Sequence, residues 1–285
     1  MRFAAFSSSG QDGLAVAGHE GHFHGFLYGD AGYPGPLDAL IRKGGDALAS
    51  AAAVLAKGDA IDLEQVTLRP PVAAPRKIIC VGLNYVDHSI ESGFTPPDYP
   101  TIFTRFTSTL IGSGAPIIRP TVSTQLDYEG EMVAVIGKEG RHIAEADALS
   151  HVMGYSIFND ASVRDYQKKS PQWTIGKNFD NTGAFGPYLV TADELPAGGK
   201  GLRIQTRLNG ATVQQASTDD MVFSVAQLIS ILSEAITLLP GDIIVSGTPA
   251  GVGMARKPPL FMKHGDVCEV EIEGIGILRN RVEDE

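Results

Sequence analysis

Short apolar runs separated by glycine and proline predict a chain rich in β-strands. The first 30 residues alternate such runs with Gly and Ser, and they predict a small antiparallel sheet. Near the C-terminus, Cys268, Val270 and Ile272 alternate with Glu269 and Glu271, which is typical of a hairpin with one solvated face. Further strands are expected at residues 77–82, 101–103, 117–120, 126–137, 153–160 and 243–246.

Helical periodicity occurs in fewer places. Pro36–Ile41 and the alanine-rich Asp46–Lys57 predict two helices separated by a Gly-Gly pair, and Ala144–Leu149 predicts a short third one. A capping box at Ser224 and an apolar stripe as far as Leu239 predict a packed helix.

A proline-rich connector, Leu68–Pro75, divides the pattern into two parts. We therefore expect a small N-terminal domain over residues 1–70 and a main domain over residues 71–285. A second pair of prolines, Pro96-Pro97, suggests a movable lid.

Composition narrows the class of protein. The chain has 285 residues and a formal net charge of −10, and it has no basic stripe, so nucleic acid is not an expected partner. Neither a signal peptide nor a membrane-spanning run is evident, which predicts a cytoplasmic protein without a membrane partner. The two cysteines, Cys80 and Cys268, fall in apolar strands and are expected to be buried thiols.

The strand at 126–137 carries acidic residues at every second position. On a strand, Asp127, Glu129 and Glu131 would share one face, about 7 Å apart. Oxygen ligands without thiolates suit a hard cation, Mg²⁺ or Mn²⁺ first and Ca²⁺ next. A solvated strand face is the more ordinary interpretation. Asp160, where a strand meets a loop, suits a site residue or a helix N-cap.

Two further places carry candidate chemistry. His88 and Glu91 are neighbours if their segment is helical, so they fit either a general base oriented by its carboxylate or a surface ion pair. Lys177 lies on a glycine-flanked loop and could reach a substrate anion or face water. The loop Gly247–Gly253 lacks a nucleotide-phosphate signature, although its amides and Thr248 could hold a carboxylate. The cluster His19, His22 and His24 is expected to be exposed rather than a metal site.

Taken together, these motifs closely resemble the fumarylacetoacetate hydrolase family from about Lys77 to Val282. The resemblance is carried by Gly82-Leu83-Asn84-Tyr85, His88, Glu91, Asp127-Tyr128-Glu129-Gly130-Glu131, Asn159-Asp160, Arg164-Asp165-Tyr166-Gln167, Gly176-Lys177 and Ser246-Gly247-Thr248-Pro249. It implies a β-rich α+β fold, in which a mixed sheet is rolled into a barrel-like core, and a homodimer. Two positions depart from the family pattern: Arg105, where many relatives carry lysine, and Asn181, where threonine is common.

The same resemblance implies roles for residues. Glu129, Glu131 and Asp160 would bind Mg²⁺ or Mn²⁺, His88 and Glu91 would form the catalytic dyad, and Lys177 would face the substrate. Substrate contacts are expected from Arg164, Gln167, Thr248 and Tyr85. The implied reaction is metal-dependent hydrolysis of a carbon–carbon bond in a 2,4-diketo acid, which gives pyruvate and a carboxylic acid.

Three alternatives stay open. The same site suits decarboxylation of oxaloacetate, and it also suits isomerisation or hydration of an unsaturated diacid. A metal-binding scaffold without turnover is disfavoured, because His88, Glu91 and Lys177 accompany the expected ligands and a scaffold would need only the metal.

Overall fold

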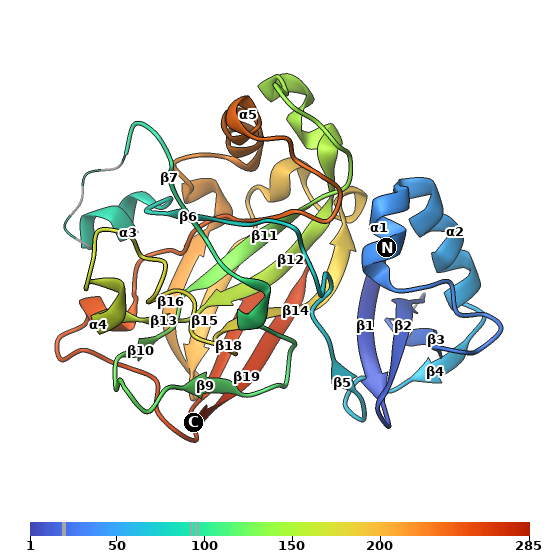
Figure 1. The fold of residues 1–285 in the computed structure, drawn as a ribbon, viewed down its shortest axis with the longest axis horizontal. Coiled ribbons are helices and arrows are strands. Elements are labelled where there is room, and N and C mark those ends of the chain that lie inside the picture. The colour runs from blue at the N-terminus through green and yellow to red at the C-terminus, as the bar shows by residue number, and fades with distance from the viewer. Residues whose placement is uncertain (19–20, 92, 94, 96) are drawn as a thin grey trace.

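A computed structural model describes residues 1–18, 21–91, 93, 95 and 97–285. Its strands form a 12-stranded sheet, a 5-stranded sheet and a short two-stranded pair (Figure 1). His19 of the predicted histidine cluster and Pro96 of the predicted lid lie outside the described residues.

The large sheet runs through the whole molecule. In spatial order it contains β4 (Asp59–Ile61), β3 (Phe23–Leu27), β2 (Gln11–Ala17), β1 (Arg2–Ser8), β14 (Gly183–Thr191), β12 (Val152–Asp160), β11 (Gly130–Ile136), β17 (Ile243–Val245), β6 (Ile78–Gly82) and β7 (Thr101–Thr104). Two short strands join it from the side, β5 (Thr67–Leu68) on β1 and β8 (Leu110–Ile111) on β14.

The smaller sheet has the order β16 (Ala211–Ser217), β15 (Arg203–Leu208), β18 (Val267–Ile272), β19 (Gly276–Asp284) and β9 (Ile117–Arg119). The two-stranded pair is β10 (Leu126–Asp127) with β13 (Ser162–Val163). The α-helices are α1 (Leu37–Lys43), α2 (Gly45–Leu55), α3 (Val86–Glu91), α4 (Arg164–Gln167) and α5 (Val225–Ala235). Short 3₁₀ turns cover Thr107–Thr109, Glu145–His151, Ala192–Glu194, Ala197–Gly199, Thr218–Asp220 and Gly253–Ala255.

The strand pairing confirms a β-rich α+β fold with a mixed sheet but not a barrel. Parallel and antiparallel pairs both occur in the large sheet. Among the described residues this sheet ends at β4 and β7, which do not pair with each other, and no closed barrel is found. The barrel-like core expected from the resemblance is therefore wrong in that respect.

The N-terminal segment is attached to the rest of the molecule through the large sheet. β1 pairs with β14 at Arg2–Val190 and Phe3–Leu189, and helices α1 and α2 cover this end of the sheet (Figure 1). The predicted connector follows β5. Because strands of both segments share one sheet, the division into separate domains at residue 70 stays a prediction.

The central strand β11 shows why the core forms on both faces of the sheet. Side chains alternate between the faces of a strand. Met132 and Ala134 pack into the cluster shared with the smaller sheet and α5, whereas Val133 and Val135 pack into the cluster shared with α1 and α2. All four side chains are fully buried, so β11 is apolar on both sides.

Topology brings the site residues to one edge of the large sheet, the edge formed by the ends of its central strands and not by an outermost strand. β6 and β17 run parallel, so the segments after both strands leave at the same edge. β11 is antiparallel to β17 and starts at that edge, and its other neighbour, β12, is antiparallel to β11 and ends there. The edge therefore collects helix α3, the loop after β17, the start of β11 and the last residue of β12, Asp160.

Most predicted helices are confirmed, with changed ends. Helix α5 starts at the predicted capping box, in which Ser224 Oγ accepts from Gln227 N (3.3 Å). It ends at Ala235 instead of Leu239, because Ile236 is extended and Leu238 pairs with Gly140. The segment expected to be a helix from Ala144 to Leu149 is a 3₁₀ turn.

Other expectations can be compared directly with the structure. Cys80 and Cys268 are buried free thiols, as predicted, and β18 and β19 form the predicted hairpin. In the described part of the chain, no helix combines the length and the apolar character needed to cross a bilayer.

The capping box of α5 gives a stability prediction. Ser224→Ala removes the side-chain acceptor at the helix N-terminus and should lower the free energy of unfolding by about 1 kcal/mol, measured by urea denaturation. Ser50→Ala, at an exposed position inside α2, is the control and should leave stability nearly unchanged. Equal effects of the two substitutions would contradict a capping role for Ser224.

Candidate active site

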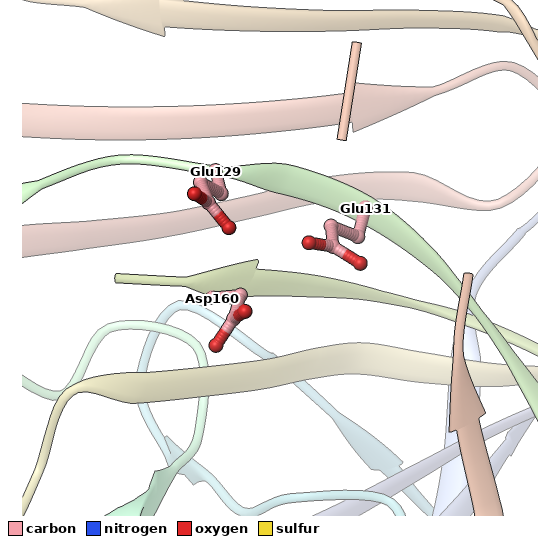
Figure 2. Close-up of side chains that lie close together, drawn as sticks. All are labelled: Glu129, Glu131 and Asp160. Carbon is pink, nitrogen blue, oxygen red and sulfur yellow. The ribbon is translucent and has the colours of Figure 1, made fainter. Parts of the chain in front are cut away.

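Three buried carboxylates lie together at the sheet edge. Glu129 and Glu131 flank the start of β11, and Asp160 ends the neighbouring strand β12 (Figure 2). The backbone joins them, because Asp160 N donates to Glu129 O (2.8 Å). One oxygen from each carboxylate lies within 4.8 Å of the others, and these three are the residues that the family resemblance implied as metal ligands.

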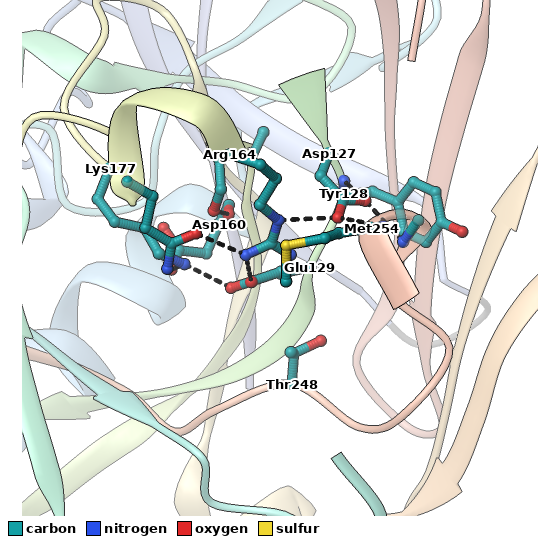
Figure 3. A network of polar contacts seen from close by, with 12 residues as sticks. Asp127, Tyr128, Glu129, Asp160, Arg164, Lys177, Thr248 and Met254 are labelled. Carbon is teal, nitrogen blue, oxygen red and sulfur yellow. Dashed lines mark hydrogen bonds and ion pairs between the residues drawn. The ribbon is translucent and has the colours of Figure 1, made fainter. Parts of the chain in front are cut away.

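Three buried cations neutralise part of this charge, and Figure 3 shows two of them, Lys177 and Arg164. Lys177 Nζ contacts Glu129 Oε2 at 2.6 Å and Asp160 Oδ2 at 2.7 Å. Arg164 contacts the other oxygen of Glu129 at 2.7 Å. Arg105 pairs with Asp160 Oδ1 and also donates to Thr182 Oγ1 at 2.6 Å.

Asp127 does not share a face with Glu129 and Glu131, so that expectation is wrong. The predicted continuous strand is interrupted at Tyr128 and Glu129, between β10 and β11, and the strict alternation fails there. The Asp127 carboxylate accepts instead from Gly253 N (2.8 Å), Met254 N (2.9 Å) and Arg164 Nε (2.8 Å). It thereby holds Arg164, which in turn contacts Glu129 (Figure 3).

Neighbouring charges move the pKa values of the two glutamates in opposite directions. Burial raises the pKa of Glu129, but Lys177 and Arg164 outweigh it and lower that pKa from 4.5 to about 2. Burial also raises the pKa of Glu131, and here the like charges of Asp160 and Glu129 add to the effect, so that pKa lies well above its usual range. Glu131 therefore has too little positive charge beside it.

The cluster fits a divalent cation. Among the described residues Glu131 has no cationic partner, and its Oε2 accepts only the Gly247 amide (2.6 Å). The buried carboxylates of the network outnumber its buried cations by one, since Asp127, Glu129, Glu131 and Asp160 face Arg105, Arg164 and Lys177. An all-oxygen donor set with excess negative charge is what Mg²⁺ or Mn²⁺ prefers. Which ion binds stays a prediction.

Helix α3 places the predicted acid–base pair beside this cluster. His88 Nδ1 lies 2.9 Å from Glu91 Oε1, at the i, i+3 spacing expected from the sequence. Gly251 N donates to both oxygens of Glu91 at 3.0 Å, so the loop after β17 fixes the carboxylate. With Nδ1 directed to Glu91, Nε2 is the ring nitrogen left to exchange a proton with a ligand.

One cavity of about 300 Å³ joins these groups. Seven of the predicted site residues line it: His88, Glu129, Glu131, Arg164, Gln167, Lys177 and Thr248. Asp160 and Glu91 are outside the lining but contact lining residues directly. Tyr85 lines a different cavity, with Asp87 and Gln215, so nothing in the geometry supports its predicted contact with substrate. The catalytic and binding roles stay predictions.

Sequence reasoning missed two residues that organise the site. Arg105 attracted notice only as a departure from the family pattern, although its side chain is fully buried against Asp160. Gln214 was not singled out at all. Its amide donates to Thr248 Oγ1 at 2.8 Å, and Thr248 in turn donates to Gly130 O at 3.0 Å. No local pattern marks either residue, because their partners are far away along the chain.

Because the pKa values of Glu131 and Glu129 are shifted in opposite directions, replacing each by glutamine should change the free energy of unfolding of the metal-free protein in opposite directions. Glu131→Gln should raise the free energy of unfolding at pH 7, because it removes a charge that the folded state disfavours. When folding raises the pKa of a carboxyl group, the group costs no stability at a pH below its pKa in the unfolded chain, near 4.5, because it is protonated in both states. The cost appears as the pH rises above that value. The advantage of Glu131→Gln over the wild type should therefore vanish below about pH 4.5.

Glu129→Gln is the matched comparison. It removes one of the two buried counter-charges of Lys177 and of Arg164, which keep Asp160 and Asp127 respectively, and should cost about 1–3 kcal/mol at pH 7. Because the folded pKa of Glu129 is lowered to about 2, this deficit should fade as the pH falls from about 4.5 toward 2. Urea denaturation across this pH range measures both variants, and a loss of stability in both at pH 7 would contradict the charge balance described above.

Metal binding should be visible as a gain in thermal stability. Adding Mn²⁺ at about 100 times its Kd to chelator-treated protein should stabilise it by about 2.7 kcal/mol. Glu131→Gln and Asp160→Asn should lose most of this gain, while the exposed Glu145→Gln should keep it. An undiminished gain in Glu131→Gln, measured by calorimetry, would rule out the cluster as the metal site.

Comparison with known proteins supports these observations. The family model for the fumarylacetoacetate (FAA) hydrolase C-terminal region matches residues 77–283. Oxaloacetate tautomerase Fahd2a, mitochondrial, from Rattus norvegicus is 43% identical over 89% of this chain and 81% of its own length. Its human counterpart FAHD2A is 40% identical over 89% of this chain and 81% of its own length. Both names specify mitochondria, so the cytoplasmic location predicted from the sequence is not confirmed.

Solved structures show the same fold. The fumarylacetoacetate hydrolase EaFAH from Exiguobacterium antarcticum has a TM-score of 0.85 and 36% identity, with full coverage of both chains. A 5-carboxymethyl-2-hydroxymuconate delta-isomerase from Mycobacterium smegmatis has a TM-score of 0.78 and 29% identity, over 100% of this chain and 99% of its own. From the family match and these identities, the chain belongs to the fumarylacetoacetate hydrolase family of enzymes.

Proposed function

We propose that this enzyme interconverts the keto and enol forms of oxaloacetate. The rat and human relatives carry the name oxaloacetate tautomerase, and their identity to this chain is 40% or more over most of its length. The hydrolysis of a 2,4-diketo acid expected from the sequence is less well supported by these relatives than the alternative built on oxaloacetate.

One observation carries the proposal: the proton-transfer group and the charge-stabilising groups open onto the same cavity. His88, Lys177 and Arg164 all line it. Tautomerisation needs a base for the C3 proton and positive charge near the oxygen on C2, and it needs no water and no second reactant. These requirements match the lining.

The proton transfer can be written for this chain. His88 Nε2 takes a proton from C3 of the keto form, and the electron pair of the C–H bond becomes the C2–C3 double bond. The π electrons of the C2–oxygen double bond move to the oxygen, which takes the proton back from His88 Nε2, so that His88 returns to its starting state. Glu91 stabilises the protonated ring through Nδ1, and Gly251 keeps Glu91 in place.

The buried cations act on the negative charge that develops on C2 oxygen. Lys177 and Arg164 are held in fixed positions by their carboxylate partners, so they need little reorganisation during the reaction. A divalent metal bound by Glu129, Glu131 and Asp160 would supply Lewis-acid charge at the same place.

Carbon–carbon bond hydrolysis is the second candidate. It is favoured by the likeness to EaFAH, which is named a fumarylacetoacetate hydrolase. It would use the same base to activate a water molecule, but it would release a carboxylic acid, whereas tautomerisation changes no carbon skeleton. Product analysis therefore separates the two reactions.

The test follows the enol absorbance of oxaloacetate after mixing with the Mg²⁺-loaded protein. A tautomerase speeds the approach to the keto–enol equilibrium, leaves the final ratio unchanged and forms no pyruvate beyond a protein-free control. His88→Gln should lower kcat/KM by about 10²–10⁴-fold, while the exposed His264→Gln should not change it.

Two results would contradict the tautomerase proposal, and a third would contradict the role of His88. Pyruvate formed in step with enol loss would indicate decarboxylation. Cleavage of an acylpyruvate, without faster relaxation of oxaloacetate, would indicate the hydrolase. Unchanged kcat/KM in a folded His88→Gln variant would remove His88 from the proton transfer.

A further inference from the structure

The residue that caps the short helix α4, Lys168, presents a third cationic side chain to the cavity. Arg164, Gln167 and Lys168 all line it. Their i, i+3 and i+4 spacing places them on one side of a helical turn, and Lys168 continues the turn in the right-handed helical conformation. Arg164 and Gln167 are buried, whereas Lys168 is exposed, so Lys168 lies at the opening of the cavity.

The inner cations of the cavity already have carboxylate partners. Lys177 is bonded to Glu129 and Asp160, and Arg164 contacts Asp127 and Glu129. Lys168 differs, because it forms no ion pair within 4.0 Å among the described residues. It is thus a cation on the lining whose charge is available to a ligand.

The next residue, Lys169, is a natural comparison. Its Nζ lies 3.2 Å from the centroid of the Tyr166 ring and so makes a cation–π contact. Lys169 is exposed, like Lys168, but it does not line the cavity. Two adjacent lysines with the same formal charge therefore differ in whether they face the site.

From this arrangement we propose that Lys168 binds the second carboxylate of a dianionic 2-oxo acid and makes the cavity selective for dicarboxylates. The inference rests on the proposed function in taking a 2-oxo acid as ligand. The 2-oxo acid end would face the buried cluster, where a divalent cation held by the carboxylates would add its charge to that of Lys177 and Arg164. The distal carboxylate would then point toward the cavity opening, where Lys168 can reach it without disturbing the buried pairs.

Two ligands that cannot enolise test this binding independently of turnover. The dimethyl analogue of oxaloacetate, 2,2-dimethyl-3-oxobutanedioate, lacks C3 protons. In 3,3-dimethyl-2-oxobutanoate a methyl group replaces its distal carboxylate, so the two ligands differ mainly in one charge. The chain has a single tryptophan, Trp173, and it lines the cavity. Its fluorescence can report the Kd of each ligand in Mg²⁺-containing buffer.

The wild type should bind the dicarboxylate about tenfold more tightly than the monocarboxylate. This factor corresponds to an interaction stronger than an exposed ion pair and weaker than a buried charge-assisted hydrogen bond. Lys168→Gln should lose most of this preference by weakening only the dicarboxylate. Lys169→Gln should retain it. If both variants lose the preference equally, the effect is one of net charge and the inference fails. It also fails if the wild type shows no preference for the dicarboxylate or binds neither ligand.

The outcome is separable from that of the proposed reaction. If Lys168→Gln alone removes the preference but the wild type does not speed the relaxation of oxaloacetate, the ligand assignment stands and the tautomerase proposal falls. If relaxation is accelerated equally in Lys168→Gln and wild type, with unchanged KM, the tautomerase proposal stands and the role of Lys168 falls.

Discussion

The site depends on keeping several ionised carboxylates out of water. An uncompensated buried charge is costly, so each carboxylate needs a cation or hydrogen-bond donors close to it. Arg105, Arg164 and Lys177 supply most of that charge. Within the described part of the chain, Glu131 receives only a backbone amide and is the least compensated of the group. This deficit gives a physical reason why a divalent cation would bind here, and the Coulomb attraction is strongest where water is excluded.

The loop after β17 connects the charged groups through its backbone. Gly247 N donates to Glu131, Gly251 N to Glu91 and Gly253 N to Asp127. Gly251 has a φ of +106°, and a Cβ there would lie 2.2 Å from Val213 O, so a larger residue would displace the loop. One glycine-rich segment thus fixes the acid of the His88 pair, a member of the carboxylate cluster and the residue that holds Arg164.

Contacts between residues close together in the sequence were predicted better than contacts that depend on how the strands pair. The helical spacing of His88 and Glu91 is a local property, and the structure shows their contact at 2.9 Å. Clustering of Glu129 and Glu131 also follows from nearby positions on the chain. Asp127 was misplaced because a break in the strand at Tyr128 cannot be read from alternating charges. The pairing of Arg105 with Asp160 depends on the sheet register, which no short motif encodes. The same limit explains why the expectation of a barrel was wrong. A sheet closes only if its two outermost strands pair with each other, and that pairing cannot be read from a short motif.

The proposed reaction moves a proton without breaking a carbon–carbon bond. The most direct measurement is proton NMR of oxaloacetate in D₂O with the Mg²⁺-loaded protein, corrected for metal alone. Proton transfer at this site should give faster exchange of the C3 protons for deuterium, no pyruvate above the control, and loss of the acceleration in His88→Gln. Pyruvate appearing as fast as the C3 signal disappears, or exchange no faster than with metal alone, would contradict it.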